Sequence, residues 1–203
     1  TVEEGKLYML QCRTGKRSPQ AAFKIAVDMV NERLITKETA ISRIKTGDIE
    51  GIFYPAIDKT QTEKLKSAFI VQGIDAVPGA ATGRVCFSAA KAEELAERGE
   101  RTLLVRKETS PEDVGGMHAA QGILTATGGK TSHAAVVARG WGKCCIVGCE
   151  KLNIDYDRRH FKCGSFTIKE GAYITLDGTT GSVYAGELKR VAPKLPESYE
   201  TLM

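Results

Sequence analysis

The run from Gly128 to Gly140, GGKTSHAAVVARG, places a turn, a helix start and a helix end in one short stretch. Thr131 or Ser132 can act as the N-cap, because a hydroxyl oxygen there accepts a hydrogen bond from an early backbone N–H of the helix. The apolar residues that follow are small, so the helix can bury one stripe close to a sheet. We expect Gly140 to end the helix.

His133 falls in the first turn of this predicted helix. Unpaired N–H groups and the helix dipole favour an anion at that point, and the same field disfavours imidazolium, so we expect a neutral, nucleophilic ring near pH 7. Gly129, Lys130, Thr131 and Ser132 are candidates for contact with a phosphate. From these residues alone, an ordinary packed or surface histidine beside a turn remains the alternative.

The longer string from Gly128 to Gly148, GGKTSHAAVVARGWGKCCIVG, resembles the phosphohistidine motif of the PEP-utilising enzymes, which interconvert phosphoenolpyruvate and pyruvate. Several members share the GG-x-[TS]-x-H core, but the continuation SHAAVVARGWGKCC is most similar to the dikinases of that family. SPEDVGGMHAA from Ser110 and LYMLQCRTGKR from Leu7 agree, so the resemblance covers nearly the whole chain. Lys130 departs from the methionine of many dikinases, and a cation there favours a phosphoryl group.

The resemblance implies a fold and a mechanism. The fold is α/β, a swivelling three-layer β/β/α phosphohistidine domain preceded by a small segment of a strand and helices. A ring nitrogen of His133 would attack the β-phosphorus of ATP, inorganic phosphate would then be released from the pyrophosphorylated intermediate, and the remaining phosphohistidine would pass its phosphoryl group to pyruvate. Mg²⁺ would be held mainly by flanking domains. Gln11 and Arg13 would be the last nucleotide contacts of an ATP-grasp domain, although an ordinary strand end with a charged turn is the alternative.

The resemblance also implies partners. These are flanking ATP-grasp and pyruvate/PEP-binding domains of the same chain, and the full enzyme is expected to be a homo-oligomer. Thr131 is expected to be a regulatory phosphorylation site for a kinase and phosphatase, or else only a helix cap. Two other functions remain open: the carrier domain of a phosphoenolpyruvate synthase or another PEP-utilising enzyme, and a non-catalytic regulatory module with the same fold.

Composition narrows the class of protein. With 203 residues of which 42% are hydrophobic, the chain can form one ordinary domain plus a smaller segment. The net charge of +4 is spread without a dense basic block, so we expect no nucleic-acid partner. No apolar run approaches the roughly 20 residues of a membrane-spanning helix. The chain lacks an initiator Met and begins on an expected strand, so we expect a piece of a longer protein that does not complete turnover alone.

The six cysteines suggest neither a metal site nor a disulfide framework. Paired CxxC spacing is absent, and the adjacent Cys144 and Cys145 suit neither arrangement. His160 and Cys163 form an HxxC without a second half. We therefore expect no metal site and reduced thiols in a reducing intracellular compartment, the cytoplasm or an organelle stroma or matrix. His118 is expected in a surface or packing role and His160 in solvent.

Residues 1–64 are expected to be the end of an ATP-grasp region plus a linker. The pattern predicts a strand over 6–11, a helix beginning at Ser18-Pro19, a helix over 36–44 and a linker over 48–64. Residues 188–203 are polar and contain prolines, and they are expected to be a linker towards a missing pyruvate/PEP-binding domain.

Residues 65–187 are expected to form the phosphohistidine domain. The predicted strands cover 70–74, 84–88, 102–106, 122–125 and 144–147, then 161–168, 173–176 and 182–184. A glycine-rich turn is predicted over 77–83 and a helix over 89–98 closed by Gly99. Ser110-Pro111 is the strongest helix start in the chain.

Overall fold

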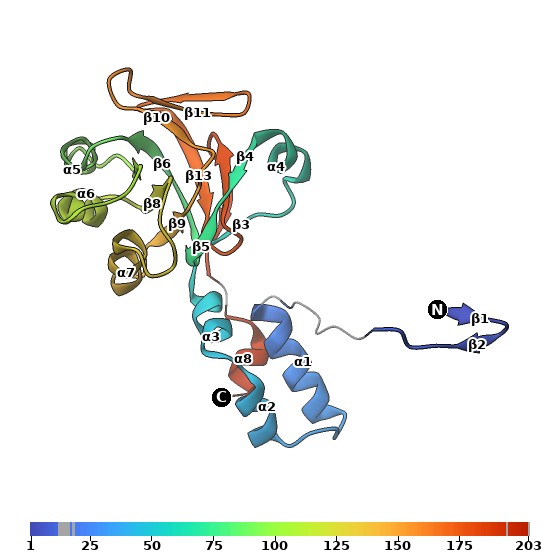
Figure 1. Ribbon diagram of the computed structural model, residues 1–203. Coiled ribbons are helices and arrows are strands. Elements are labelled where there is room, and N and C mark those ends of the chain that lie inside the picture. Colours follow the sequence, from blue (N-terminus) through green and yellow to red (C-terminus); the bar gives the residue numbers. More distant parts are fainter. Residues whose placement is uncertain (12–16, 18, 194, 203) are drawn as a thin grey trace. The chain divides into compact units, whose positions relative to one another are not determined.

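The computed structural model describes residues 1–11, 17, 19–193 and 195–202 (Figure 1). The chain divides into two compact units. Unit 1 is Thr1–Ile52 with Leu195–Met203, and unit 2 is Phe53–Lys194. Within the described ranges, no helix combines the length and the apolar character needed to cross a membrane.

Unit 1 begins with a short β-hairpin. β1 (Val2–Glu3) pairs antiparallel with β2 (Lys6–Leu7) around a turn in which Glu4 and Gly5 have positive φ. The strand predicted over 6–11 therefore stops at Leu7, and residues 8–11 continue as exposed chain. An alternating apolar pattern favours a strand when one face of the strand packs against other residues. Here all of these side chains are exposed, so no such packing extends the strand.

The remaining described elements of unit 1 are helices. Its helices are α1 (Pro19–Asn31), α2 (Lys37–Arg43), α3 (Thr46–Phe53, whose last residue belongs to unit 2) and α8 (Glu197–Leu202). The first two confirm the predicted helices, and Thr36 caps α2 by accepting a hydrogen bond from Thr39 N–H at 3.2 Å. Phe23 lies in the core of this unit, and its ring meets that of Tyr199 edge to face at 5.5 Å.

Two segments predicted as linkers contain ordered elements. Residues 48–64 include most of α3, then β3 (Ala56–Ile57) and the start of α4 (Thr62–Ala68). Residues 188–203 include β15 (Arg190–Val191) and α8. Both segments are mostly polar, but each contains single apolar side chains that are buried, such as Ile52 and Leu202, which are 1% and 2% exposed. An element with one or two buried residues has no readable period, so only tertiary packing reveals it.

Unit 2 is built on an eight-stranded sheet in the order β4-β14-β13-β6-β7-β8-β9-β5. β6, β7, β8 and β9 run parallel to one another, whereas the remaining strands pair antiparallel with their neighbours. The strands are β4 (Phe69–Gln72), β5 (Ile74–Val77), β6 (Ala80–Cys86), β7 (Thr102–Arg106), β8 (Gly122–Thr125), β9 (Cys144–Val147), β13 (Tyr173–Asp177) and β14 (Ser182–Ala185).

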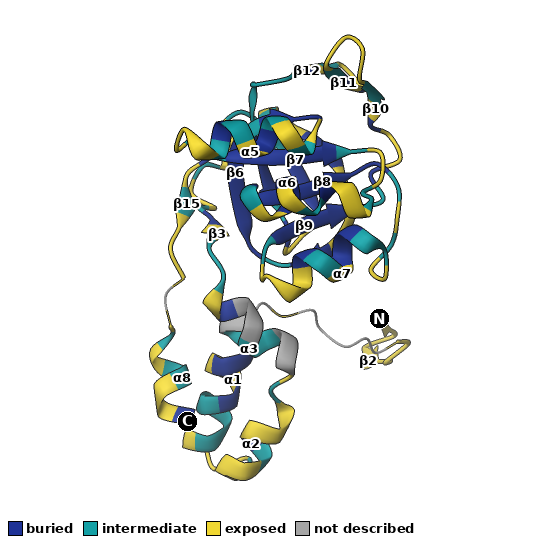
Figure 2. Cartoon of the chain, turned by 90° about the vertical axis from the view of Figure 1, so that its left-hand side faces the viewer, coloured by how far each residue is buried: buried dark blue, intermediate teal, exposed yellow. Residues whose placement is uncertain are grey.

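Alternate side chains of the parallel strands enter two different cores. Leu103 and Val105 of β7 join Ile174 of the antiparallel strands in one core, whereas Leu104 joins Met117 in a second core beneath the helices. Those helices are α5 (Ala89–Glu97), α6 (Val114–Ala119) and α7 (His133–Gly140). They lie over the buried strands, as Figure 2 shows. Antiparallel strands, parallel strands and helices thus form three layers, which confirms the predicted α/β class with its β/β/α layering.

The single strand predicted over 70–74 is two strands at opposite edges of the sheet. β4 ends at Gln72 and β5 begins at Ile74, so Gly73 alone connects the two edge strands and the sheet must coil to bring its edges together. A Cβ on Gly73 would lie 2.3 Å from Cys149 Sγ and 2.8 Å from the Val147 carbonyl oxygen. Close packing therefore requires glycine here.

Residues 80–83, predicted as part of a turn, are the first half of β6 and are all buried. The turn itself is at Gly79, where φ is +110°. A Cβ on Gly83 would lie 2.8 Å from the Arg101 carbonyl oxygen. The small residues of this stretch therefore allow close packing inside the sheet.

Local signals in the middle of the chain are confirmed. β7, β8 and β9 occupy their predicted ranges. α5 starts after Ser88, which accepts a hydrogen bond from Lys91 N–H, and Gly99 follows its end with φ +79°. Ser110 starts the 3₁₀ turn η1 (Pro111–Asp113) that leads into α6, and its N–H donates to the Asp113 carboxylate at 3.0 Å.

A small antiparallel sheet follows β9. It consists of β10 (Asn153–Asp155), β11 (His160–Cys163) and β12 (Phe166–Lys169), in that order. The single strand predicted over 161–168 is therefore a hairpin, which turns at Gly164 with φ +56°. The predicted strands over 173–176 and 182–184 are confirmed as β13 and β14.

The two ends of unit 2 pair with each other. β3 and β15 are antiparallel, and we call this two-stranded element the tether. The Gln61 side-chain amide donates to the Lys189 carbonyl oxygen at 3.0 Å and accepts from the Lys189 N–H at 3.1 Å, which extends the pairing. Ala80 N–H donates to the Pro55 carbonyl oxygen, so the tether lies at the edge where β6 begins.

Candidate active site

The candidate site lies where β8 gives way to α7. Ser132 is the N-cap of α7 and accepts from Ala135 N–H, which decides between the two predicted caps. His133 is the first helical residue, as expected. Of the two glycines before it, Gly128 has φ +101° and a Cβ there would lie 2.9 Å from Ser132 Cβ, whereas Gly129 has neither constraint.

α7 packs closely because its buried residues are alanines. Ala134, Ala135 and Ala138 are at most 2% exposed and belong to the core beneath the helices. The helix ends at Gly140 as predicted, but Trp141 is its C-cap and Gly142 supplies the left-handed residue, with φ +62°. This packing fixes the position of His133 relative to the sheet.

His133 is half-buried and has a partner that the sequence analysis missed. Its Nδ1 lies 3.0 Å from Oγ1 of Thr109, which belongs to the loop after β7. β7 and β8 are adjacent and parallel, so the loops that follow them meet at one edge of the sheet. The one sequence signal that could have found Thr109 is its position just after the buried strand β7, because β7 is the strand that precedes β8 and the His133 loop in the chain.

The loop that carries Thr109 is held by a buried carboxylate. Asp113, 4% exposed, accepts from Ser110 N–H at 3.0 Å and pairs with Arg106 Nε at 3.3 Å. Arg106 also donates to the Phe87 carbonyl oxygen at 2.9 Å. Lys107 N–H donates to the Tyr156 hydroxyl at 2.8 Å. These bonds position the loop against three other segments.

The residues predicted to contact a phosphate differ in their exposure and in their present partners. Lys130 Nζ pairs with Asp75 Oδ1 at 3.1 Å, and both side chains are more than half exposed. Such an exposed pair contributes little, about 0–1 kcal/mol, so the Lys130 side chain can leave it for another anion. Thr131 is exposed beside the half-buried Ser132. Arg139 donates to the Lys130 carbonyl oxygen at 3.2 Å, and so braces the loop.

The other predicted residues lie elsewhere. Gln11 is in the exposed chain after β2 in unit 1, and Arg13 lies outside the described residues. His118 packs edge to face on Trp141 at 5.1 Å between ring centres, which confirms its packing role. His160 was expected in solvent, but it is half-buried within β11, the middle strand of the small sheet.

The described thiols are poor candidates for the reactive group. The five described cysteines are free and buried, and the described residues contain no group of three or more His, Cys, Asp or Glu that could hold a metal ion. Burial raises the pKa of Cys86, Cys144 and Cys149 to about 12, so these thiols stay protonated near neutral pH.

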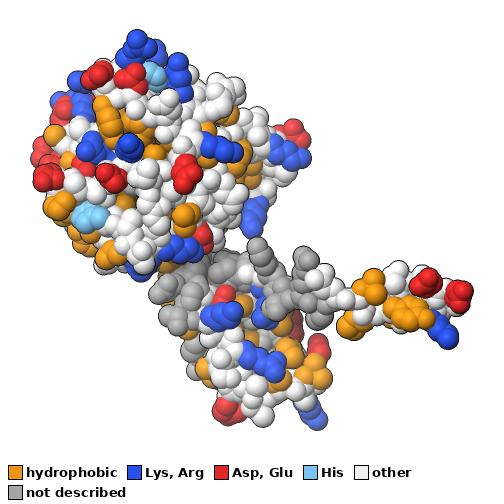
Figure 3. All heavy atoms as spheres, in the orientation of Figure 1, with side chains coloured by type: hydrophobic (Ala, Val, Ile, Leu, Met, Phe, Trp, Pro, Cys, Tyr) orange, Lys and Arg blue, Asp and Glu red, His pale blue; other side chains and the backbone are white. Residues whose placement is uncertain are grey.

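Charge is mixed on the surface. On the face shown in Figure 3, lysine and arginine side chains are interspersed with aspartate and glutamate. An anion approaching this face would therefore depend on local groups rather than on a broad positive field.

Comparison with known proteins identifies this arrangement. Residues 99–181, from Gly99 just after α5 to the turn between β13 and β14, match the family model described as "PEP-utilising enzyme, mobile domain". The resemblance seen in the sequence is thereby confirmed.

More specifically, the chain is similar over its whole length to pyruvate, phosphate dikinase. It is 51% identical over 203 residues to "Pyruvate, phosphate dikinase, chloroplastic" from Flaveria trinervia. The aligned region covers the whole of this chain and 21% of that relative. It is 47% identical over 204 residues to "Pyruvate, phosphate dikinase" from Clostridium symbiosum, covering 23% of it. The chain thus spans about a fifth of the length of the curated relatives it matches.

Proposed function

We propose that this chain is the phosphoryl-carrier part of a pyruvate, phosphate dikinase and that His133 carries the phosphoryl group. The observation that carries the proposal is His133 at the capped start of α7 with Nδ1 held by Thr109. The match to the mobile domain of PEP-utilising enzymes and the identity to dikinases support it. The substrates would be ATP and phosphate on one side and pyruvate and phosphoenolpyruvate on the other.

Thr109 determines which ring nitrogen reacts. A neutral imidazole has one N–H donor and one nitrogen with a lone pair. We assign the proton to Nδ1, which donates to Thr109 Oγ1, so the lone pair is on Nε2. Nε2 then attacks phosphorus, the bond from phosphorus to the donor's oxygen breaks, and that oxygen leaves with its electron pair.

The start of α7 stabilises the transferred group. Its first N–H groups and the positive end of the dipole face the anion. Lys130 can exchange Asp75 for a phosphoryl oxygen, and the Thr131 hydroxyl can donate to another. Mg²⁺ would arrive with the substrates or be held mainly by flanking domains.

The tether lies opposite His133 along the strands. The tether meets the edge where β6 begins, whereas His133 follows the end of β8. A strand the length of β7 spans roughly 15 Å at about 3.3 Å per residue. His133 therefore lies at least about that far from the tether along the strand direction. This arrangement suits a carrier that visits two separate substrate sites on flanking domains.

Thr131 is the proposed regulatory position. It is exposed, and Ser132 rather than Thr131 caps the helix, so a kinase could modify Thr131 without removing the cap. A phosphate there adds a charge of about −1.5 to −2 close to His133 and would repel an incoming phosphoryl donor.

The carrier role is tested by phosphorylation in trans. The chain is incubated with phosphoenolpyruvate, Mg²⁺ and a catalytic amount of a dikinase pyruvate/PEP-binding domain, and an acid-labile mass increase of one phosphoryl group is measured. We expect it on His133, lost in His133→Ala and retained in the matched variant His118→Ala. Equal labelling of His133→Ala would refute the assignment, and no labelling of the wild-type chain would favour a non-catalytic module.

A further inference from the structure

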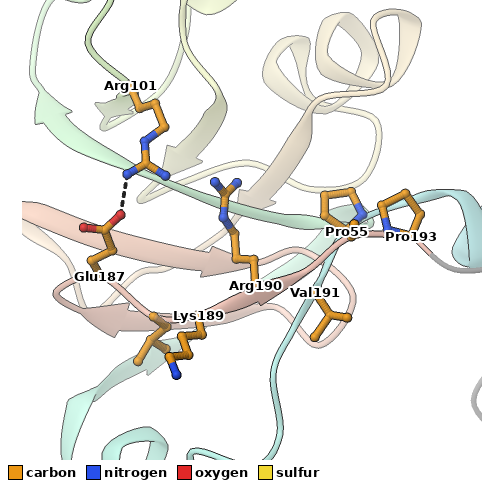
Figure 4. Close-up of a pocket in the computed structure, with 9 residues that line it drawn as sticks. Pro55, Arg101, Glu187, Lys189, Arg190, Val191 and Pro193 are labelled. Atoms are coloured by element: carbon orange, nitrogen blue, oxygen red, sulfur yellow. Dashed lines mark hydrogen bonds and ion pairs between the residues drawn. The ribbon is translucent and has the colours of Figure 1, made fainter.

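A second candidate site lies at the tether, away from His133. A hollow of about 550 Å³ opens between the residue before β7, the segment before β15 and β15 itself. Figure 4 shows the side chains of Arg101 and Arg190 on this hollow, with Pro55 and Pro193 at one end. All of these residues belong to unit 2.

The two arginines share too little negative charge. Arg101 is in ion-pair contact with Glu187, whereas the described residues give Arg190 no carboxylate in such contact. The Arg190 guanidinium donates to the Ala80 carbonyl oxygen at 3.3 Å, and this long bond uses one of its five N–H groups. Burial and then the charge of Arg101 lower the pKa of Arg190, and the charge of Glu187 partly opposes them, so a single carboxylate serves two cations that lie close enough to repel each other.

A bound oxyanion would neutralise the excess positive charge of the two arginines. A guanidinium binds phosphate oxygens through parallel N–H bonds, and such charge-assisted bonds are about twice as strong as neutral ones. Pro55 and Pro193 supply apolar walls that compete for none of these donors.

We propose that this hollow binds a small phosphate-bearing molecule between Arg101 and Arg190. Arg190 belongs to β15 of the tether, and Arg101 precedes β7 in the body of unit 2. A bound phosphate would therefore join the tether to the sheet. This site does not depend on His133 or on the carrier function.

The test is a titration of the ¹⁵N-labelled chain followed by NMR, in a His133→Ala background that removes the reactive ring at α7. Inorganic phosphate and glycerol 3-phosphate are the two probes, and potassium chloride at equal ionic strength is the control. We expect saturable shifts at the amides of Arg101, Lys189 and Arg190, with a dissociation constant of about 1 mM. Saturation by inorganic phosphate alone would identify the free ion as the ligand, whereas tighter binding of glycerol 3-phosphate would show that the apolar walls contribute.

Variants locate the site. Arg190→Gln should weaken binding about ten-fold, and Lys162→Gln, an equal charge change at an exposed position of β11, should leave it unchanged. Arg101→Gln is the second variant, should Arg190→Gln fail to fold. Shifts spread evenly over the basic surface, shifts equal to those with chloride, or wild-type affinity in a folded arginine variant would overturn the proposal.

Discussion

Replacing Thr109 with valine tests how the fold prepares His133. The substitution keeps the shape of the side chain and removes the one hydroxyl that lies 3.0 Å from Nδ1. A half-buried hydrogen bond of this kind contributes about 0.5–1.5 kcal/mol. If that energy keeps the lone pair on Nε2, its loss slows phosphorylation of His133 roughly two-fold to twelve-fold, since about 1.4 kcal/mol is ten-fold.

The assay uses potassium phosphoramidate, a small phosphoryl donor that needs no partner domain. The initial rate is followed by ³¹P NMR, and the His133 tautomer is followed by ¹⁵N NMR of the ring. Thr109→Ser should restore both, and Thr167→Val, at an exposed position of β12, should change neither. An unchanged rate together with an unchanged tautomer in Thr109→Val would refute the positioning role, as would failure of serine to restore the rate.

Three other predictions concern the scaffold. Gly73→Ala should lower the free energy of unfolding by about 1–3 kcal/mol in urea denaturation, because its Cβ meets packed atoms, whereas Gly129→Ala should change it by less than about 0.5 kcal/mol; equal effects would contradict the packing argument. Ser132→Ala should cost about 0.5–1 kcal/mol by the same measurement through loss of the cap, and no change would mean that the 3.5 Å bond contributes nothing. Cys86 and Cys149 should resist iodoacetamide in the folded Cys12→Ser chain at pH 8. Because their folded pKa of about 12 exceeds the unfolded value of about 8.5, their stabilising effect should be complete below pH 8.5 and lost as the pH rises towards 12; rapid alkylation of the folded chain would contradict this.

Local chemistry accounts for the elements that the sequence predicts correctly. α5 and η1 begin at serines whose neighbours complete a cap, and α2 begins at Thr36 for the same reason. β7 and β8 are short apolar runs bounded by polar residues and are buried on both faces. Each of these signals depends on residues within a few positions of one another, so it can be read without knowing the fold.

Errors occur where distant residues determine the outcome. Gly73 looks like an interior strand residue, but Cys149 and Val147 require it at the connection between opposite sheet edges. The segment around Ile52 looks like a polar linker, but the core of unit 1 buries that one side chain. Neither effect leaves a periodic pattern in the sequence.

The sequence by itself determined the local setting of the proposed reactive centre: a capped helix start, a diglycine turn and His133 lie within a few consecutive residues. The tertiary structure alone decided what surrounds it. Thr109 reaches Nδ1 because adjacent parallel strands end at the same edge of the sheet, and the two ends of unit 2 pair as a tether at the opposite edge. Contacts within a turn of chain are encoded locally, whereas strand order and pairing depend on which buried surfaces fit together.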